Sequence, residues 1–139
     1  MGPLNALLVH DHPEPFESLK QTLRSLSVEV YSVGTCRDAV NRITQTNPHL
    51  VFTECALRDG SWVSFLDLAE VANEPFNVIV VGAIPNIELY VSVMERGAFD
   101  YVAPPFEQER ISSVLRSAEL DARRRRETRA LTAGTRWFT

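Results

Sequence analysis

The stretch Glu95–Phe106, ERGAFDYVAPPF, connects a helix to a short strand within twelve residues. Gly97 follows a segment whose apolar residues have helical spacing, and glycine is a common residue at the end of a helix. The residues Asp100–Ala103 then predict a strand, and Pro104 and Pro105 come directly after it. The chain therefore passes from a helix to a strand through a glycine.

Four other apolar segments predict strands: Ala6–His10, Val28–Val33, Leu50–Thr53 and Asn77–Gly82. Apolar residues at helical spacing predict the helices between them, which begin near Pro13, Thr35, Trp62, Ile87 and Glu107. Strands and helices alternate five times, at spacings of about 20 to 25 residues, which is typical of a parallel sheet with helices on both faces. The sequence therefore predicts an α/β domain.

The functional site of such a sheet lies at the carboxyl ends of its strands. In this chain those ends carry His10, Asp11 and His12 after the first strand, and Glu54 after the third. Gly82 and Ala83 follow the fourth strand, and Ala103 and Pro104 end the fifth. The order of the elements thus predicts where the site is, independently of any motif.

The segments LLVHDHP, PHLVFTECALRDG, VIVVGA and ERGAFDYVAPPF resemble the receiver domain of bacterial two-component response regulators. The resemblance covers roughly Leu4 to Ala118. It implies a flavodoxin-like, doubly wound fold with five parallel strands in the order 2-1-3-4-5 and helices on both faces. Typical members accept a phosphoryl group on an aspartate that ends the third strand, using Mg²⁺ held by an acidic pair after the first strand.

Carried over by position, the resemblance places the acidic pair on His10 and Asp11, the phosphoacceptor on Glu54, the hydroxyl residue on Gly82 and the lysine on Pro104. Gly82 has no side chain, Pro104 has no charge, and the only lysine, Lys20, falls within the first predicted helix. An acyl phosphate needs a carboxylate nucleophile, a metal and groups that bind the phosphoryl oxygens. The residues therefore predict a degenerate receiver that is not an enzyme, needs no cofactor and binds Mg²⁺ weakly, through Asp11 and Glu54.

Two alternatives remain open from the sequence. In one, Glu54 is a working phosphoacceptor that uses Asp11 and a divalent metal. In the other, His10, Asp11, His12 and Glu54 form a metal or small-ligand site on a flavodoxin-like fold. Glu54 itself is expected either to imitate a phosphoaspartate or to bond to the loop backbone. Arg58 is the one local cation that could contact Glu54 or an anion.

The resemblance also predicts an interaction face, made of the helix Ile87–Arg96, the strand Asp100–Ala103 and the helix after Glu107. Receivers commonly use this face to dimerise or to dock on another protein. Tyr101 holds the family's aromatic switch position and is expected to be exposed on this face, beside Tyr90. Pro105 keeps the proline whose preceding peptide bond is commonly cis in the family. The expected partner is another protein, an effector domain or a second copy of the chain.

The net charge of −4 hides an asymmetry. Residues 1–118, the receiver-like domain, carry 8 basic and 15 acidic side chains, so nucleic acid is not an expected partner there. Residues 119–139 carry 6 basic and 3 acidic side chains and predict a basic helical extension or linker, whose run Arg123–Arg126 is expected to be solvated.

Two cysteines are too few for a disulfide scaffold, and no apolar run approaches a membrane span. A cytoplasmic protein is expected.

Overall fold

Five parallel strands form the central sheet, in the order β2-β1-β3-β6-β7. The computed structural model describes residues 4–136 of the 139-residue chain. The sheet strands are β1 (Asn5–Val9), β2 (Glu29–Val33), β3 (Leu50–Thr53), β6 (Asn77–Val81) and β7 (Asp100–Val102). Counting the sheet strands alone, this is the order 2-1-3-4-5, so the predicted fold is confirmed.

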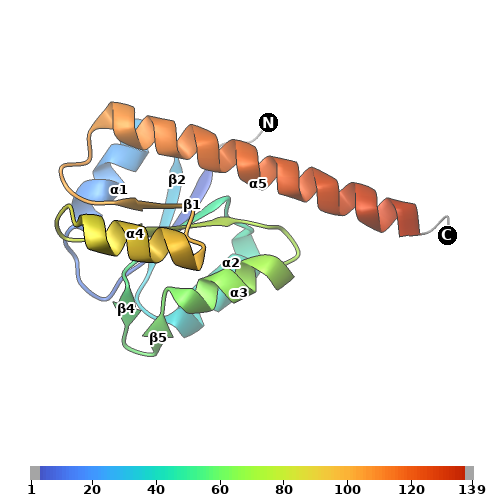
Figure 1. Cartoon of the computed structure of the whole chain (residues 1–139), viewed down its shortest axis with the longest axis horizontal. Helices are drawn as coiled ribbons and strands as arrows, with labels where there is room; N and C mark the ends of the chain where they lie inside the picture. Colours follow the sequence, from blue (N-terminus) through green and yellow to red (C-terminus); the bar gives the residue numbers. More distant parts are fainter. Residues whose placement is uncertain (1–3, 137–139) are drawn as a thin grey trace.

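Helices cover both faces of the sheet (Figure 1). They are α1 (Phe16–Ser25), α2 (Cys36–Thr46), α3 (Val63–Val71), α4 (Ile87–Arg96) and α5 (Gln108–Arg136). The helices α1 and α5 pack on one face, and α2, α3 and α4 pack on the other. The helix α5 is much longer than the others and projects beyond the rest of the domain (Figure 1).

The alternation of side chains along each strand supplies both cores. In β3, Leu50 and Phe52 face α1 and α5, whereas Val51 faces the opposite core. In β6, Ile79 joins the first core and Val80 the second. Successive residues of a strand point to opposite faces, so a strand buried on both sides is apolar at nearly every position. This explains why these segments read as continuous apolar runs.

Local signals in the sequence set several of the helix ends. The hydroxyl of Thr35 accepts a hydrogen bond from the backbone N–H of Asp38 (3.0 Å) and caps α2. Gly97 ends α4 with a φ of +113°, in the left-handed region that glycine adopts without strain. Both residues were predicted to mark these ends.

The segment after Glu54, for which no strand was predicted, forms a hairpin. The strands β4 (Ala56–Leu57) and β5 (Gly60–Ser61) pair antiparallel. At its turn, the carboxylate of Asp59 accepts hydrogen bonds from the backbone N–H groups of Cys36 (2.7 Å) and Arg37 (3.0 Å), at the start of α2. These hydrogen bonds lower the pKa of Asp59. They attach the hairpin to α2.

The expectation of a solvated arginine run is wrong for Arg125 and Arg126. Residues 119–136 continue α5, and these two side chains donate hydrogen bonds to the backbone carbonyls of Phe76 and Pro75. Residues 137–139 of the predicted extension lie outside the described residues. None of the helices within residues 4–136 has the length and apolar character needed to cross a membrane.

We expect Thr35→Ala to lower the free energy of unfolding by about 1 kcal/mol, because the backbone N–H of Asp38, in the first turn of α2, loses its acceptor. Urea unfolding followed by circular dichroism measures this. Thr44→Ala is the matched control, since the Thr44 hydroxyl donates only to Val40 O, one turn earlier in α2. That variant should be as stable as the wild type; an equal loss in both variants would contradict a capping role.

Candidate functional site

The carboxyl ends of the strands meet at one edge of the sheet, as predicted. Val9 of β1 pairs with Thr53 of β3, and Thr53 pairs with Val80 of β6. Val81 pairs with Val102 of β7. The residues that follow these strands, from His10 to Pro104, therefore lie along a common edge.

Glu54 bonds to the loop between β1 and α1. Its Oε1 atom accepts hydrogen bonds from the backbone N–H groups of Asp11 (2.9 Å) and His12 (3.0 Å). Its Oε2 atom lies 3.2 Å from Nδ1 of His12. Two roles were expected for Glu54: to imitate a phosphoaspartate or to bond to the loop backbone. The structure shows the second, since the carboxylate is hydrogen-bonded to backbone N–H groups of the loop. The contact ties the end of β3 to the loop that follows β1.

Arg58 contacts Asp11 and not Glu54. Its Nη2 atom lies 2.7 Å from Oδ1 of Asp11, so the retained acidic residue of the predicted pair already has a cationic partner. The imidazole of His10 stacks on Phe16, with the ring centroids 4.3 Å apart, and its Nδ1 atom lies 2.7 Å from the carbonyl oxygen of His12.

The two histidines make different contacts, which bears on the alternative of a metal or small-ligand site at His10, Asp11, His12 and Glu54. His10 packs against buried Phe16, whereas the side chain of His12 is largely exposed and contacts Glu54. Within residues 4–136, no three or more His, Cys, Asp and Glu side chains are grouped so that they could hold a metal ion. The set His10, Asp11, His12 and Glu54 is thus not a preformed ligand cluster.

Tyr101 occupies the space beside Gly82. A Cβ atom on Gly82 would overlap the Tyr101 hydroxyl and lie 2.6 Å from Cζ of the same ring. The side chain is buried, with 6% of the residue exposed, and its hydroxyl donates a hydrogen bond to the carbonyl oxygen of Ile84 (2.8 Å). Burial raises the pKa of Tyr101, so the phenol stays protonated and can donate. The expectation of an exposed Tyr101 is wrong, because Gly82 leaves room for the ring.

Sequence reasoning treated Gly82 only as a missing hydroxyl. Gly82 directly follows β6, and Tyr101, nineteen positions later in the sequence, lies in the neighbouring strand β7, so their contact depends on the pairing of the two strands. A glycine at a strand end, together with an aromatic residue on the next strand, is the only sequence signal of it. That signal does not specify the ring's direction.

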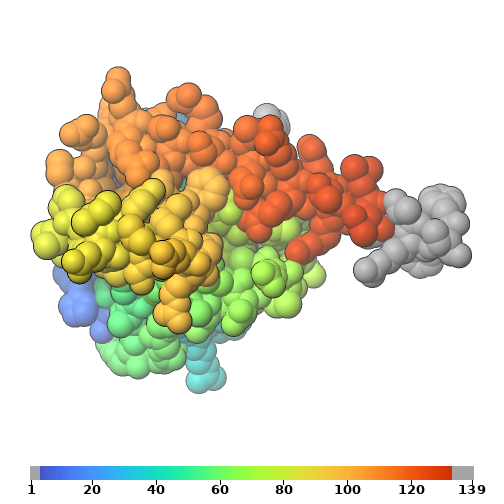
Figure 2. Space-filling view, viewed as in Figure 1, coloured from blue at the N-terminus to red at the C-terminus, as the bar shows by residue number. Residues whose placement is uncertain are grey.

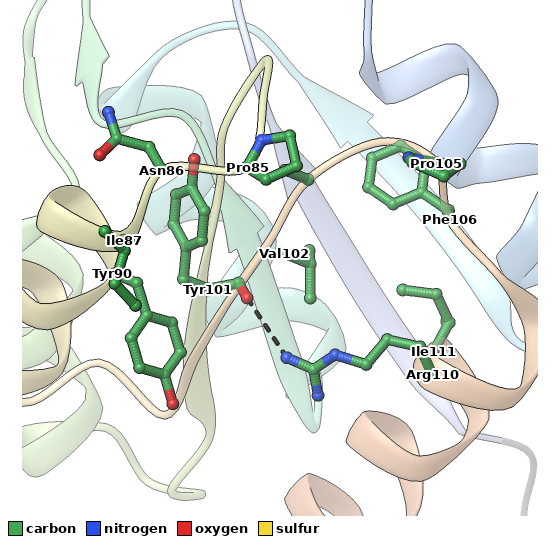
Figure 3. A pocket seen from close by; sticks show the side chains of 11 residues that line it. Pro85, Asn86, Ile87, Tyr90, Tyr101, Val102, Pro105, Phe106, Arg110 and Ile111 are labelled. Atoms are coloured by element: carbon green, nitrogen blue, oxygen red, sulfur yellow. Dashed lines mark hydrogen bonds between the residues drawn. The ribbon is translucent and has the colours of Figure 1, made fainter.

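A pocket of about 350 Å³ opens between α4, β7 and α5, over the buried ring of Tyr101 (Figure 3). Arg110 lines it and forms a fork with Asp100: Nη1 lies 3.2 Å from Oδ2, and Nη2 lies 3.2 Å from Oδ1. Nη2 also donates to the carbonyl of Tyr101 (3.5 Å) (Figure 3). The pocket is bounded on one side by the bend at Pro104–Pro105, whose peptide bond is cis as the family pattern implied.

Apolar side chains of α4 are exposed next to this pocket. Ile87 is 73% exposed and Tyr90 36%, and both line the pocket rim. Val91 and Ile84 are exposed as well. We call the surface formed by α4, β7 and the first turns of α5 the α4–β7–α5 face. It carries Tyr90 as predicted, whereas Tyr101 lies beneath it.

Residues 6–116 match the family model of the response regulator receiver domain. The chain belongs to this family. It is therefore a receiver domain of a two-component signal transduction system. Nitrogen assimilation regulatory protein NtrX of Azorhizobium caulinodans is 30% identical over 132 residues, which are 90% of this chain and 28% of NtrX. The chain spans about half, or less, of the length of the curated relatives that it matches.

Solved receiver structures have the same fold. The signal receiver domain of an HD domain-containing protein from Pseudomonas fluorescens Pf-5 superposes with a TM-score of 0.76 at 18% identity, over 91% of this chain and 94% of that one. The beryllofluoride-activated NtrC4 receiver domain dimer superposes with a TM-score of 0.69 at 22% identity, over 85% of this chain and 98% of that one. At these identities the likeness establishes the fold.

We expect Gly82→Ala to displace the Tyr101 ring and to lower the free energy of unfolding by about 1 to 3 kcal/mol, since the new methyl group overlaps the ring. Denaturant unfolding and the NMR signals of the Tyr101 ring measure the two effects. Gly34→Ala is the control, because a Cβ there meets nothing closer than His10 O at 3.7 Å.

Combining Gly82→Ala with Tyr101→Ala separates the clash with the ring from any other effect of an alanine at position 82. If Gly82 is needed for the ring, Gly82→Ala should cost nothing further once Tyr101 is replaced by alanine. We call the space beside Gly82 that the Tyr101 ring fills the Tyr101 slot. An unchanged NMR signal of the Tyr101 ring in Gly82→Ala would show that this slot does not hold the ring.

Proposed function

We propose that this receiver domain signals through protein contacts without being phosphorylated. The observation that carries the proposal is the packing of Tyr101 in the space beside Gly82. In typical receivers a hydroxyl residue at the position of Gly82 tethers the phosphoryl group and pulls the switch loops toward the active state. Gly82 has no side chain to respond in this way, and Tyr101 is already held inward by its hydrogen bond to Ile84.

The surroundings of Glu54 support the same proposal. The Glu54 carboxylate has contacts with two backbone N–H groups and the imidazole of His12. Pro104 offers neither a charge nor an N–H to a phosphoryl oxygen, and Lys20 pairs with Glu17 on α1 (3.3 Å). A phosphoryl group on Glu54 would therefore lack both the cation and the hydroxyl that stabilise it in typical receivers. On this ground we propose that the domain is not an enzyme.

The residues also fit Mg²⁺ poorly. This ion needs near-octahedral oxygen ligands, usually carboxylates and waters. Of the two available carboxylates, Asp11 is paired with Arg58 and Glu54 with the loop N–H groups. His10, at the position of the second acid, is stacked on Phe16. We expect weak Mg²⁺ binding and propose no resident cofactor.

The α4–β7–α5 face is the proposed contact surface. It combines the exposed side chains of Ile87 and Tyr90 with the apolar pocket above Tyr101. A protein partner or an effector domain would bury these groups, and each large apolar side chain buried contributes about 1.5 to 3 kcal/mol. A second copy of the chain is the first partner to test, since the structurally similar beryllofluoride-activated NtrC4 receiver domain is a dimer.

We expect neither the wild type nor Glu54→Asp to be modified by acetyl phosphate, or to bind beryllofluoride, in the presence of Mg²⁺. The extra methylene of Glu54 displaces the nucleophile, which can cost about a hundredfold in rate. Glu54→Asp corrects this, but each missing donor to the phosphoryl oxygens costs roughly 3 kcal/mol of transition-state stabilisation. Mass spectrometry and NMR measure modification.

The positive control restores all four family positions: His10→Asp, Glu54→Asp, Gly82→Thr and Pro104→Lys. This variant, in which Gly82→Thr also displaces the Tyr101 ring, should be modified under the same conditions. Stoichiometric modification of the wild type would contradict the proposal and establish Glu54 as a phosphoacceptor. Modification of Glu54→Asp would show that the extra methylene of Glu54 was by itself what prevented phosphorylation.

We expect Ile87→Glu and Tyr90→Glu to weaken self-association at least tenfold while the fold persists. A charge in the contact would replace an apolar side chain, and about 1.4 kcal/mol corresponds to a tenfold change. Sedimentation equilibrium measures association, and circular dichroism measures folding. Val71→Glu is the control, because Val71 is 78% exposed at the end of α3, outside the face.

Two results would count against this surface. Association that is unchanged in Ile87→Glu and Tyr90→Glu, or equally weakened in Val71→Glu, would place the contact elsewhere. A monomeric wild type would exclude the second copy and leave a different protein as the partner of the face.

A further inference from the structure

The C-terminal half of α5 lies against the loops at the amino-terminal edge of the sheet. This edge is opposite the one that carries Glu54 and Gly82. Figure 2 shows α5 packed along the body over much of its length before it projects beyond it. The buried face of the helix continues from Ala118 to Ala122, and arginines follow it.

Three arginines of this segment bind main-chain oxygens of the body. Together Arg125, Arg126 and Arg129 donate to six backbone carbonyls, those of Asn47, Pro48, Glu70, Ala72, Pro75 and Phe76. Arg126 alone reaches two loops: its Nε atom bonds to Pro75 O (2.8 Å) and its Nη2 atom to Pro48 O (2.8 Å). The planar guanidinium, with five N–H donors, suits such divided contacts.

The environment of Arg126 shows that it is part of the packed structure. Its side chain is only 17% exposed, and Nε lies 3.5 Å from Oε2 of Glu74. Burial lowers the pKa of the Arg126 guanidinium below its ordinary value. A cation that is largely shielded from water needs partners for its N–H groups, and the loop carbonyls supply them.

Asn77, the first residue of β6, binds the same helix from the sheet side. Its Nδ2 atom donates to Ala118 O (2.8 Å), and its Oδ1 atom accepts from Nη2 of Arg125 (2.6 Å). Asn77 is buried, and both ends of its amide are thus occupied by α5. A buried amide that lost these partners would carry a desolvation cost, so the strand and the helix hold each other in register.

Helix propensity alone would not hold this segment. The segment continues the 29-residue helix α5 and so needs no nucleus of its own, but the pairs Glu119–Arg123 and Asp121–Arg125 are partly exposed, so each adds little. The contacts with the loops are the additional constraint. They fix both the helicity of the segment and its direction relative to the sheet.

We infer that Arg125, Arg126, Arg129 and Asn77 form a clamp that makes residues 119–132 a rigid part of the receiver, in place of a flexible linker. We call these four residues the α5 clamp. The clamp sets the direction of α5 beyond the sheet. Because β6 runs from Asn77 to Val81, directly before Gly82, one strand connects the clamp to the Tyr101 slot. The clamp does not depend on whether the domain is phosphorylated.

The test is hydrogen exchange of the whole chain, read for the amides of residues 119–132. The triple variant Arg125→Ala, Arg126→Ala, Arg129→Ala should exchange there at least tenfold faster than the wild type. The amides of β1 and β3 should keep their wild-type protection. Alanine has the highest helix propensity, so faster exchange could not come from a weaker intrinsic helix. Residual dipolar couplings of the same amides report the direction of the segment relative to the sheet.

Arg124→Ala is the matched control, since Arg124 belongs to the same arginine run and is exposed. It should leave exchange and dipolar couplings unchanged. Arg126→Lys, which keeps the charge but loses the fork, should accelerate exchange in residues 119–132 without unfolding the sheet, even if the triple variant fails to fold. Wild-type protection of these amides in Arg126→Lys, or the same acceleration in Arg124→Ala, would overturn the clamp.

Discussion

Apart from its edge strand β2, the central sheet is buried on both of its faces, and the positions of the functional groups depend on this burial. Parallel strands need crossover connections, and each crossover helix covers one face. With α1 and α5 on one side and α2, α3 and α4 on the other, the strand ends are the part of the sheet left accessible. The loops after β1, β3, β6 and β7 therefore gather at one edge, whichever side chains they carry.

At that edge, the groups that a typical receiver offers to a phosphoryl group and a metal are occupied by other contacts. Glu54 accepts hydrogen bonds from the loop after β1, Asp11 is paired with Arg58, and the space beside Gly82 holds the ring of Tyr101. Each contact satisfies a polar group or fills a volume that would otherwise be open. Together they favour one conformation of the edge, which is the physical basis of the proposed function.

The helix α5 is common to the two surfaces that the structure singles out. Its first turns carry Arg110 and Ile111, which line the pocket of the α4–β7–α5 face. Its later turns carry the arginines of the α5 clamp at the opposite edge of the sheet. A partner that binds the face thus contacts the same rigid body whose direction the clamp sets.

The sequence by itself determined the elements, their order and the edge that carries the site, because these follow from periodicity, from local caps such as Thr35 and Gly97, and from the rules of parallel sheets. Three features needed the tertiary structure: the hairpin with Asp59 on α2, the inward ring of Tyr101, and the docking of Arg125 and Arg126. Each joins residues distant along the chain. The direction of such a side chain depends on which space and which partners the folded neighbours leave, and no local pattern encodes that.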